Sequence, residues 1–264
     1  MDIICASICY RGYAEDEVAA TCANAPAIGY RLMEIHGPMV WSVEAVERFD
    51  LPRAQAMIAQ SGMRCAGVYS PGWGGSDDAD VRQRAAAIAR CAEYAAELGG
   101  DHLASTGAQP RGAAGALDRV ADCASRALEA LPTDLPVRLA LEPHYGNVLE
   151  QPDDFRFVLD RVADPRLGIC VDTGHFHSAG VDTVALIHEF ADRLVNVHLK
   201  DHLGTVSVGI GRGEVDLPRV VAALRAVGYS GGLTVEPEVE DPENLPQYTH
   251  EAYVYLSGLL GQKL

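Results

Sequence analysis

The sequence predicts a (β/α)8 barrel, in which eight parallel strands close into a ring and each strand is followed by a helix. Short apolar runs typical of strands alternate with longer segments rich in Ala, Glu, Arg and Leu along the 264 residues. Eight such runs occur, and no change of composition divides the chain. We therefore expect residues 1–264 to form a single α/β barrel domain, with a doubly wound open sheet as the alternative fold.

The eight predicted strands share an apolar centre bounded by charged or turn-forming residues. The last four runs read VRLALEPH, LGICVDTGH, LVNVHLKD and GLTVEPE. The predicted strands occupy residues 2–10, 31–37, 64–70, 101–106, 137–144, 167–175, 194–201 and 232–238.

The segments between these runs carry helix signals. Residues 80–100 end in Gly-Gly, which is typical of a helix C-terminus. Residues 151–164 begin with Pro152 and two acidic residues, as a helix N-terminus prefers. Residues 241–261 predict a closing helix that seals the barrel or forms a subunit contact.

Composition excludes several classes of protein. A formal net charge of −16 opposes binding to nucleic acid. The chain starts without a basic segment and has no apolar run long enough to span a bilayer, so we expect a cytoplasmic protein with no membrane partner. Seven cysteines without CxxC spacing suit reduced core residues better than a disulfide framework.

Polar residues gather at the predicted strand ends, which is where (β/α)8 barrels carry their catalytic groups. Residues two apart on a strand share a face, and in the last four runs one face is apolar while the other becomes polar towards the end. Six of the nine histidines lie at or just after a predicted strand end, namely His36, His144, His175, His177, His198 and His202. The polar faces carry Ala140, Glu142 and His144, then Cys170 and Asp172, then Asn196, His198 and Lys200, then Thr234, Glu236 and Glu238.

One inward acid or imidazole from each of four successive strands should converge near the barrel mouth: Glu142, Asp172, His198 and Glu236. Three carboxylates buried together repel one another unless a cation lies among them. These residues therefore predict a divalent metal site. Three oxygen donors and one imidazole suit Mn²⁺ or Mg²⁺, with Co²⁺ and Zn²⁺ as alternatives.

The motifs LALEPH, GICVDTGH, VNVHLKDH and GIGRGEVDLPRVVAALRAVGYSGGLTVEPE resemble the xylose isomerase-like TIM barrels. This family includes sugar phosphate isomerases and epimerases, ketose 3-epimerases, inosose isomerases and dehydratases, and the endonuclease IV type of AP endonuclease (family 2). The resemblance covers nearly the whole chain and implies the same four metal ligands. It also implies that His175, three residues after Asp172, faces the substrate.

The chain departs from two branches of this family. The ketose 3-epimerases carry a second catalytic glutamate a few residues after the first ligand, about where this chain has Val148. The endonuclease branch needs further ligands for a three-metal cluster, and the acidic charge opposes DNA. Both a standard two-glutamate epimerase and an endonuclease are therefore disfavoured.

A metal at this site would polarise a ketone and stabilise the enediolate that forms when a base removes the neighbouring proton. Returning the proton to the other face gives epimerisation, moving it to the adjacent carbon gives isomerisation, and expelling a β-substituent gives elimination. The catalytic candidates are His144, His175 and Lys200. We favour His144 as the base, because it lies two residues beyond Glu142 on the same face; its alternative role is to support the metal ligands.

Other residues near strand ends are candidates for binding the substrate. Trp73 could stack on a sugar face or pack in the core. Arg212, in the glycine-rich GIGRGEVD segment, could bind a carboxylate or phosphate or pair with Glu214. The predicted substrate-binding set is Glu34, His36, Trp73, His177 and Arg212.

These features predict a divalent-metal-dependent isomerase or epimerase acting on a keto-sugar or ketocyclitol. The alternatives are a lyase or dehydratase that performs β-elimination on a 3-keto sugar or glycoside, and a non-catalytic metal-binding subunit of a complex. The expected partner is a small carbohydrate or cyclitol, and a homo-oligomer stays open.

Overall fold

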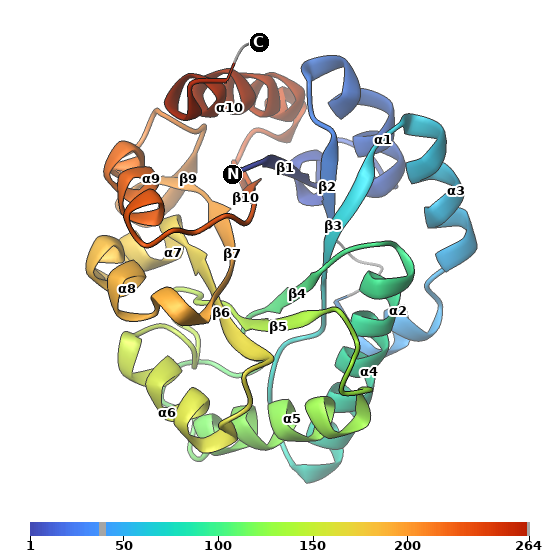
Figure 1. Cartoon of the computed structure of the whole chain (residues 1–264), viewed down its shortest axis with the longest axis vertical. Helices are drawn as coiled ribbons and strands as arrows, with labels where there is room; N and C mark the ends of the chain where they lie inside the picture. The colour runs from blue at the N-terminus through green and yellow to red at the C-terminus, as the bar shows by residue number, and fades with distance from the viewer. Residues whose placement is uncertain (37–40, 263–264) are drawn as a thin grey trace.

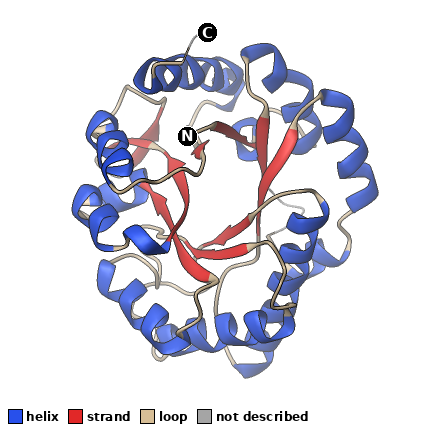
Figure 2. Ribbon diagram, in the orientation of Figure 1, coloured by secondary structure: helices blue, strands red, loops and turns tan. Residues whose placement is uncertain are grey.

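The computed structural model describes residues 1–36 and 41–262, and in it eight parallel strands form a closed barrel inside a ring of helices (Figures 1 and 2). The strands follow the order β1-β10-β7-β6-β5-β4-β3-β2 around the ring. The (β/α)8 prediction is confirmed, and the closure of the sheet rules out the open alternative. The strands are β1 Ile3–Ala6, β2 Leu32–Ile35, β3 Arg64–Tyr69, β4 His102–Ser105, β5 Arg138–Leu141, β6 Leu167–Asp172, β7 Leu194–Leu199 and β10 Leu233–Val235.

Each barrel strand lies within one predicted run, and every run extends beyond its strand at the carboxyl end. The first run leaves the sheet after Ala6 and continues as the 3-10 helix η1, Ser7–Tyr10. Gly37, which ends the second run, lies outside the described residues. Glu142 and Glu236 each follow the last residue of a strand and precede a proline. Proline cannot donate to the ladder and favours an extended residue before it, so the chain leaves the sheet at these two acids.

The helices cover the outside of the barrel, and their ends are capped as the sequence suggests. The side chain of Asp77 accepts hydrogen bonds from the first turn of α4, and Gly99 just past its end has a φ of +82°. α10 packs against β1 and β10, as predicted for a closing helix. The helices are α1 Glu17–Ile28, α2 Val43–Glu47, α3 Leu51–Ser61, α4 Asp78–Glu97, α5 Ala116–Ala130, α6 Pro152–Val162, α7 Thr173–Ser178, α8 Thr183–Glu189, α9 Leu217–Ala226 and α10 Leu245–Leu260, with 3-10 turns η2 Ala191–Arg193 and η3 Pro242–Asn244.

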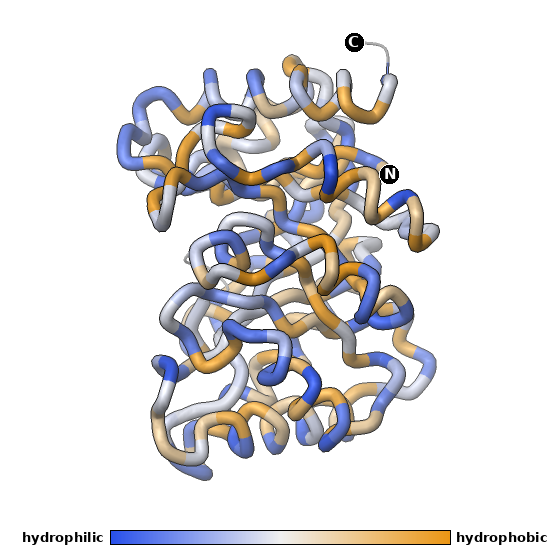
Figure 3. Tube along the Cα trace, turned by 90° about the vertical axis from the view of Figure 1, so that its left-hand side faces the viewer, coloured by the Kyte–Doolittle hydropathy of each residue, from blue (hydrophilic) through white to orange (hydrophobic). Residues whose placement is uncertain are grey.

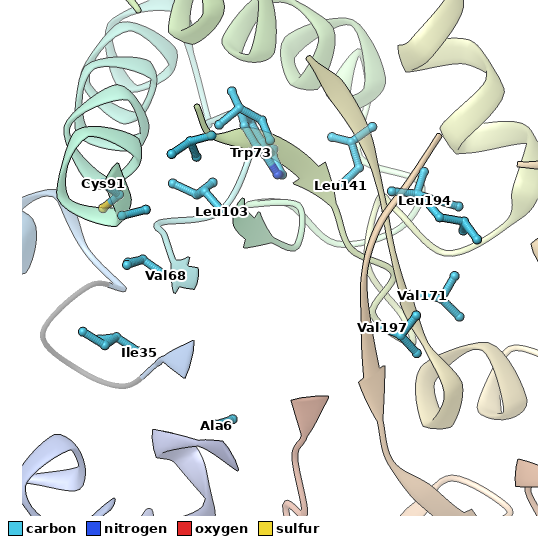
Figure 4. Packing of buried hydrophobic residues seen from close by; sticks show 14 of the residues in the cluster. Ala6, Ile35, Val68, Trp73, Cys91, Leu103, Leu141, Val171, Leu194 and Val197 are labelled. Carbon is cyan, nitrogen blue, oxygen red and sulfur yellow. The ribbon is translucent and has the colours of Figure 1, made fainter. Parts of the chain in front are cut away.

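The main apolar core lies between the strands and the helices, where Leu103, Leu141 and Val171 pack (Figure 4). Along the tube in Figure 3, hydrophobic and hydrophilic residues alternate at short intervals, as expected for elements with one buried face. Inside the barrel, only the small side chains of Ala104, Ala140 and Cys170 form a separate buried cluster among the described residues. These small residues leave space in the barrel interior for polar side chains.

Trp73 lies in this core rather than at the barrel mouth, which corrects its predicted place in the substrate-binding set. Its side chain is fully buried beside Leu103 and Leu141 (Figure 4). The indole Nε1 donates a hydrogen bond to the carbonyl oxygen of Ala140 at 3.2 Å. Of the two roles predicted for Trp73, packing is the one that this position allows.

One antiparallel pair of strands lies outside the barrel wall. This pair, β8 Asp201–Leu203 and β9 Val206–Val208, follows β7 and was not predicted, because two strands of three residues carry little periodic signal.

Across residues 1–36 and 41–262, the helices are too short or too polar to cross a bilayer.

Candidate functional site

Four neighbouring strand ends bring Glu142, Asp172, His198 and Glu236 together. One potential ligand atom from each residue lies within 4.8 Å of those from the other three, and all four side chains are buried. The register of the barrel explains this, because His198 on β7 pairs directly with Asp172 on β6 and with Thr234 on β10. The arrangement has the size and the donor types of a site for one metal ion.

Asp172 is oriented by the helix that follows it. Its Oδ1 accepts a hydrogen bond from the backbone N–H of His175 at 2.8 Å and caps α7, which leaves Oδ2 directed into the cluster. The chain turns tightly here, since a Cβ on Gly174 would lie 2.5 Å from Nε2 of His202. The acid and the glycine at this strand end therefore place one carboxylate oxygen at the site.

Lys200 provides one positive charge beside these carboxylates. Its Nζ lies 3.3 Å from Asp172 Oδ2, 3.3 Å from Glu236 Oε2 and 2.6 Å from Glu238 Oε2. Burial alone would lower the pKa of Lys200, but the carboxylates of Asp172 and Glu236 raise it well above its usual range. Burial raises the pKa of Asp172 despite the ammonium. Asp172 Oδ2 and Glu236 Oε2 make no hydrogen bond with any described residue, so both oxygens are available to a cation.

Glu34 lies fully buried beneath the cluster, so it does not line the mouth as predicted. Its Oε1 is 3.1 Å from Nε2 of both His36 and His198. Its Oε2 accepts hydrogen bonds of 2.9 Å from Asn196 and from Thr234. Burial opposes ionisation of Glu34, but His198 and His36 together hold its pKa well below its usual range. The predicted substrate contact of Glu34 is therefore corrected to a contact with buried imidazoles.

His102 continues this polar layer towards the other end of the barrel. Its Nε2 lies 3.3 Å from Glu34 Oε2, and its Nδ1 lies 2.7 Å from Oδ1 of the exposed Asp101. Room for the ring comes from Gly67, where a Cβ would lie 2.2 Å from Nε2 of His102. Burial by itself lowers the pKa of His102, but the hydrogen bond to Asp101 and the nearby carboxylate of Glu34 outweigh it and raise the pKa to about 9.

A cavity of about 330 Å³ opens above the four-residue cluster. All three predicted catalytic residues, His144, His175 and Lys200, line it, as does the predicted substrate-binding residue His36. Its wall also includes residues that were not predicted, namely Ile8, Arg11, Trp41, Tyr69, Arg84, Thr106 and Glu238.

The two histidines of the cavity wall face each other, with ring centroids 4.0 Å apart. His144 Nδ1 lies 3.0 Å from the carbonyl oxygen of Tyr145. A carbonyl oxygen only accepts, so this nitrogen carries a proton and the neutral ring keeps Nε2 as a proton acceptor. His175 Nε2 lies 3.1 Å from Lys200 Nζ, and burial together with the Lys200 charge holds the pKa of His175 well below its usual range.

His177 and Arg212 lie outside the cavity. His177 Nε2 is 3.3 Å from Glu214 Oε2. Arg212 pairs with Glu251 on α10 and covers the ring of Tyr248, so its predicted pairing with Glu214 is wrong. Neither His177 nor Arg212 is among the described residues that line the cavity. Substrate contacts by these two residues would therefore require a change of position.

Trp41, like Tyr69, is an aromatic residue of the cavity wall that sequence reasoning missed. The guanidinium carbon of Arg11 lies 4.1 Å from the centre of its ring, and Arg11 Nη1 is 2.8 Å from Glu238 Oε1. Arg11 directly follows the first predicted run, and Glu238 belongs to the inward face of the last, so these two had a positional signal. Trp41 lies in a loop, where strand and helix periods give no information.

The raised pKa of His102 predicts a pH-dependent contribution to stability. The folded-state value of about 9 lies above the unfolded value of about 6.5, so the protonated ring stabilises the fold below about pH 6.5 and this contribution is lost as the pH rises through about 9. We expect His102→Gln to lower the free energy of unfolding more at about pH 6 than at about pH 9.5. Urea denaturation at both pH values measures this, with the exposed His188→Gln on α8 as the control. An equal loss at both pH values would contradict the assignment.

Relatives of known name match parts of this chain. Rhizopine catabolism protein MocC of Rhizobium meliloti is 33% identical over 133 residues, which are 43% of this chain and 40% of that protein. An inosose dehydratase of Geobacillus kaustophilus is 30% identical over 137 residues, 44% of each chain. A ketose 3-epimerase of Arthrobacter globiformis is 29% identical over 213 residues, 71% of this chain and 68% of that one. The chain thus spans less than half the length of the first two relatives.

Solved structures share the whole fold. D-allulose 3-epimerase from Methylomonas sp., in complex with D-allulose, has a TM-score of 0.80 at 17% identity and covers 98% of this chain and 96% of its own. IOLI protein with a bound zinc atom has a TM-score of 0.78 at 13% identity, with 99% and 98% covered. A family profile described as xylose isomerase-like TIM barrel matches residues 22–256. Since this match takes in nearly all of the barrel, the chain belongs to the xylose isomerase-like TIM barrel family.

Proposed function

We propose that this protein is a divalent-metal-dependent isomerase or epimerase of a keto-sugar or ketocyclitol. The observation that carries the proposal is the buried cluster of three carboxylates and one imidazole directly beneath a cavity of about 330 Å³. The cavity wall supplies His144, His175 and Lys200, which can move protons at a bound substrate. Similarity to a ketose 3-epimerase and to the fold of a D-allulose 3-epimerase supports this substrate class.

The proposed metal ligands are Glu142, Asp172, His198 and Glu236. Asp172 Oδ2 and Glu236 Oε2 make no hydrogen bond with a described residue and lie 3.3 Å from the Lys200 ammonium, so they suit a cation. The zinc atom bound by IOLI protein supports a divalent one. Their donor set suits Mn²⁺ first, with Mg²⁺, Co²⁺ and Zn²⁺ as alternatives. A divalent ion held there would polarise the carbonyl of the substrate and stabilise the negative charge that develops on its oxygen.

The chain's own residues then handle the proton. His144 Nε2 is the proposed acceptor for the proton on the carbon next to the carbonyl, because Nδ1 is engaged with the Tyr145 carbonyl oxygen. His175, packed against His144 and bonded to Lys200, is proposed to hold a substrate hydroxyl in place. Lys200 keeps an ammonium near the reacting oxygens. Return of the proton to the opposite face or to the adjacent carbon decides between epimerisation and isomerisation.

Dehydration of an inosose or elimination from a 3-keto sugar is the second candidate. The position of a second epimerase glutamate is held by the buried Val148, and the nearby Glu150 is engaged by Arg111 at 2.9 Å. Lys200, whose Nζ lies 3.1 Å from His175 Nε2 at the cavity wall, could donate a proton to a departing hydroxyl. The inosose dehydratase similarity favours the same chemistry. A non-catalytic metal-binding subunit is the third candidate, but such a subunit would have no use for these proton-transfer groups.

The test is a solvent-exchange screen. The purified chain with Mn²⁺ is incubated in D₂O with ketohexoses and inososes, and NMR and mass spectrometry follow each sugar. We expect deuterium at the carbon next to the carbonyl and a product of altered configuration or carbonyl position, with loss of both on chelation. A product lighter by one water would instead select the dehydratase. If the protein binds Mn²⁺ but causes neither exchange nor water loss with any sugar, the result would contradict an enzyme and favour the non-catalytic binding subunit.

We expect His144→Ala to reduce the exchange rate by about 100-fold or more, the scale for losing a general base. Metal content and folding should change little, since His144 is exposed and outside the ligand cluster. The readout is substrate C–H exchange by NMR at saturating Mn²⁺, with His177→Ala, which lies outside the cavity, as the matched control. Exchange at the wild-type rate in His144→Ala, together with its loss in His175→Ala or Lys200→Ala, would assign the base to one of the latter two.

A further inference from the structure

We propose that Glu34 is a positioning residue of the metal centre, which holds His198 and, through His36, Glu236 in the orientation that a metal ion requires. This inference rests on the proposed function, because it concerns the same centre. Glu34 itself is fully buried on β2, across the barrel interior from His198 on β7. It therefore acts through its neighbours, since it is not among the described residues that line the cavity.

The two oxygens of Glu34 have different tasks. Oε2 is fixed by hydrogen bonds of 2.9 Å from Asn196 Nδ2 and Thr234 Oγ1, and His102 Nε2 lies 3.3 Å from it. Oε1 faces the other way, 3.1 Å from His198 and 3.1 Å from His36. With Oε2 held from three sides the carboxylate cannot rotate, so Oε1 is a fixed acceptor beneath the metal centre.

The first consequence is the tautomer of His198. A carboxylate oxygen only accepts, so the Nε2 that faces Glu34 carries a hydrogen, and the Nδ1 that faces Glu142 Oε1 carries one as well. Binding of a cation would displace the hydrogen on Nδ1, because Glu34 retains the one on Nε2. Nδ1 is the nitrogen that faces the cluster, in contact with Glu142 Oε1 and 3.1 Å from Glu236 Oε2. Bonding of the second imidazole nitrogen to a carboxylate is a general means of orienting a metal-binding histidine. Glu34 thereby turns the correct atom of His198 towards the ion.

The second consequence reaches Glu236 through His36. His36 Nε2 lies 3.1 Å from Glu34 Oε1, and its Nδ1 lies 3.4 Å from Glu236 Oε1. The ring is held from one side by Tyr69, with centroids 4.7 Å apart. His36 thus engages one oxygen of Glu236 and leaves Oε2 directed into the cluster, where it has no hydrogen-bond partner among the described residues. A single carboxylate supports two of the four proposed ligands.

The test compares Mn²⁺ affinity, measured by EPR titration of the full chain, across three variants. Glu34→Gln keeps the shape but offers one acceptor oxygen and one N–H₂ donor, so it cannot satisfy both imidazoles on one side and Asn196 and Thr234 on the other. We expect its dissociation constant for Mn²⁺ to rise about 10- to 100-fold. Thr234→Ser is the matched control, because it keeps the hydroxyl that donates to Glu34 Oε2 and removes only a methyl group from the same buried layer; its Mn²⁺ affinity should stay near that of the wild type. Glu142→Gln, which loses a proposed ligand, should bind Mn²⁺ more weakly than either.

The outcomes separate this inference from the proposed function. Wild-type affinity in Glu34→Gln together with weak binding in Glu142→Gln would overturn the positioning role and leave the metal centre in place. Absence of Mn²⁺ binding by the wild type would overturn the proposed function itself. Should Glu34→Gln fail to fold, long-range ¹H–¹⁵N spectra of the Zn²⁺-loaded wild type decide the question. A proton on Nε2 of His198 supports the role of Glu34, and a proton on Nδ1 with a bare Nε2 overturns it.

Discussion

The rest of the site depends on one constraint, the electrostatic repulsion among Glu142, Asp172 and Glu236. These three carboxylates lie together at one end of the barrel, and each is at most 3% exposed. Lys200 contributes a single ammonium, which is also 2.6 Å from Glu238. That ammonium is shared among three carboxylates, and although His198 and His36 also contact Glu142 and Glu236, two of the buried oxygens keep no hydrogen bond within the described chain. Burial of like charges is costly unless a cation compensates them, and a divalent ion is the simplest such cation. Beneath this level, the further carboxylate of Glu34 is compensated differently, by imidazoles.

The barrel holds these charged side chains in a fixed geometry. Small side chains at Ala104 and Ala140 leave the interior open, so a layer of imidazoles and one carboxylate fits where a barrel of this type would otherwise be filled by branched apolar residues. The acids proposed as metal ligands come from strand ends whose direction is set by a following proline or by a helix cap. Parts of the cavity wall, including His144 and Trp41, lie on loops after the strands. Rigid elements thus hold the charged centre, and loops shape the space in which a substrate would lie.

Sequence patterns predicted the barrel and the convergence of four strand-end residues, because both depend on the periodicity of apolar and polar residues. This periodicity can be read directly from the sequence. The alternation of residues along a strand shows which face a residue occupies but not its depth along the barrel axis. For this reason Glu34 was expected at the mouth, although it lies beneath the proposed metal centre. Depth also explains why Trp73 was placed wrongly: this residue follows a strand, yet its side chain folds back into the core. The partners of Arg212 and the role of Trp41 depend on loop paths and on α10, which no local pattern specifies.

The central claim, one divalent ion held by residues of four adjacent strands, is tested most directly by anomalous diffraction from crystals of the Mn²⁺-loaded protein. We expect a single anomalous peak within about 2 to 2.5 Å of an oxygen of Glu142, Asp172 and Glu236 and of Nδ1 of His198. We also expect Nε2 of His198 to stay against Glu34. A peak elsewhere in the chain, or one with any two of these four side chains more than about 4 Å away and so beyond direct ligation, would contradict it.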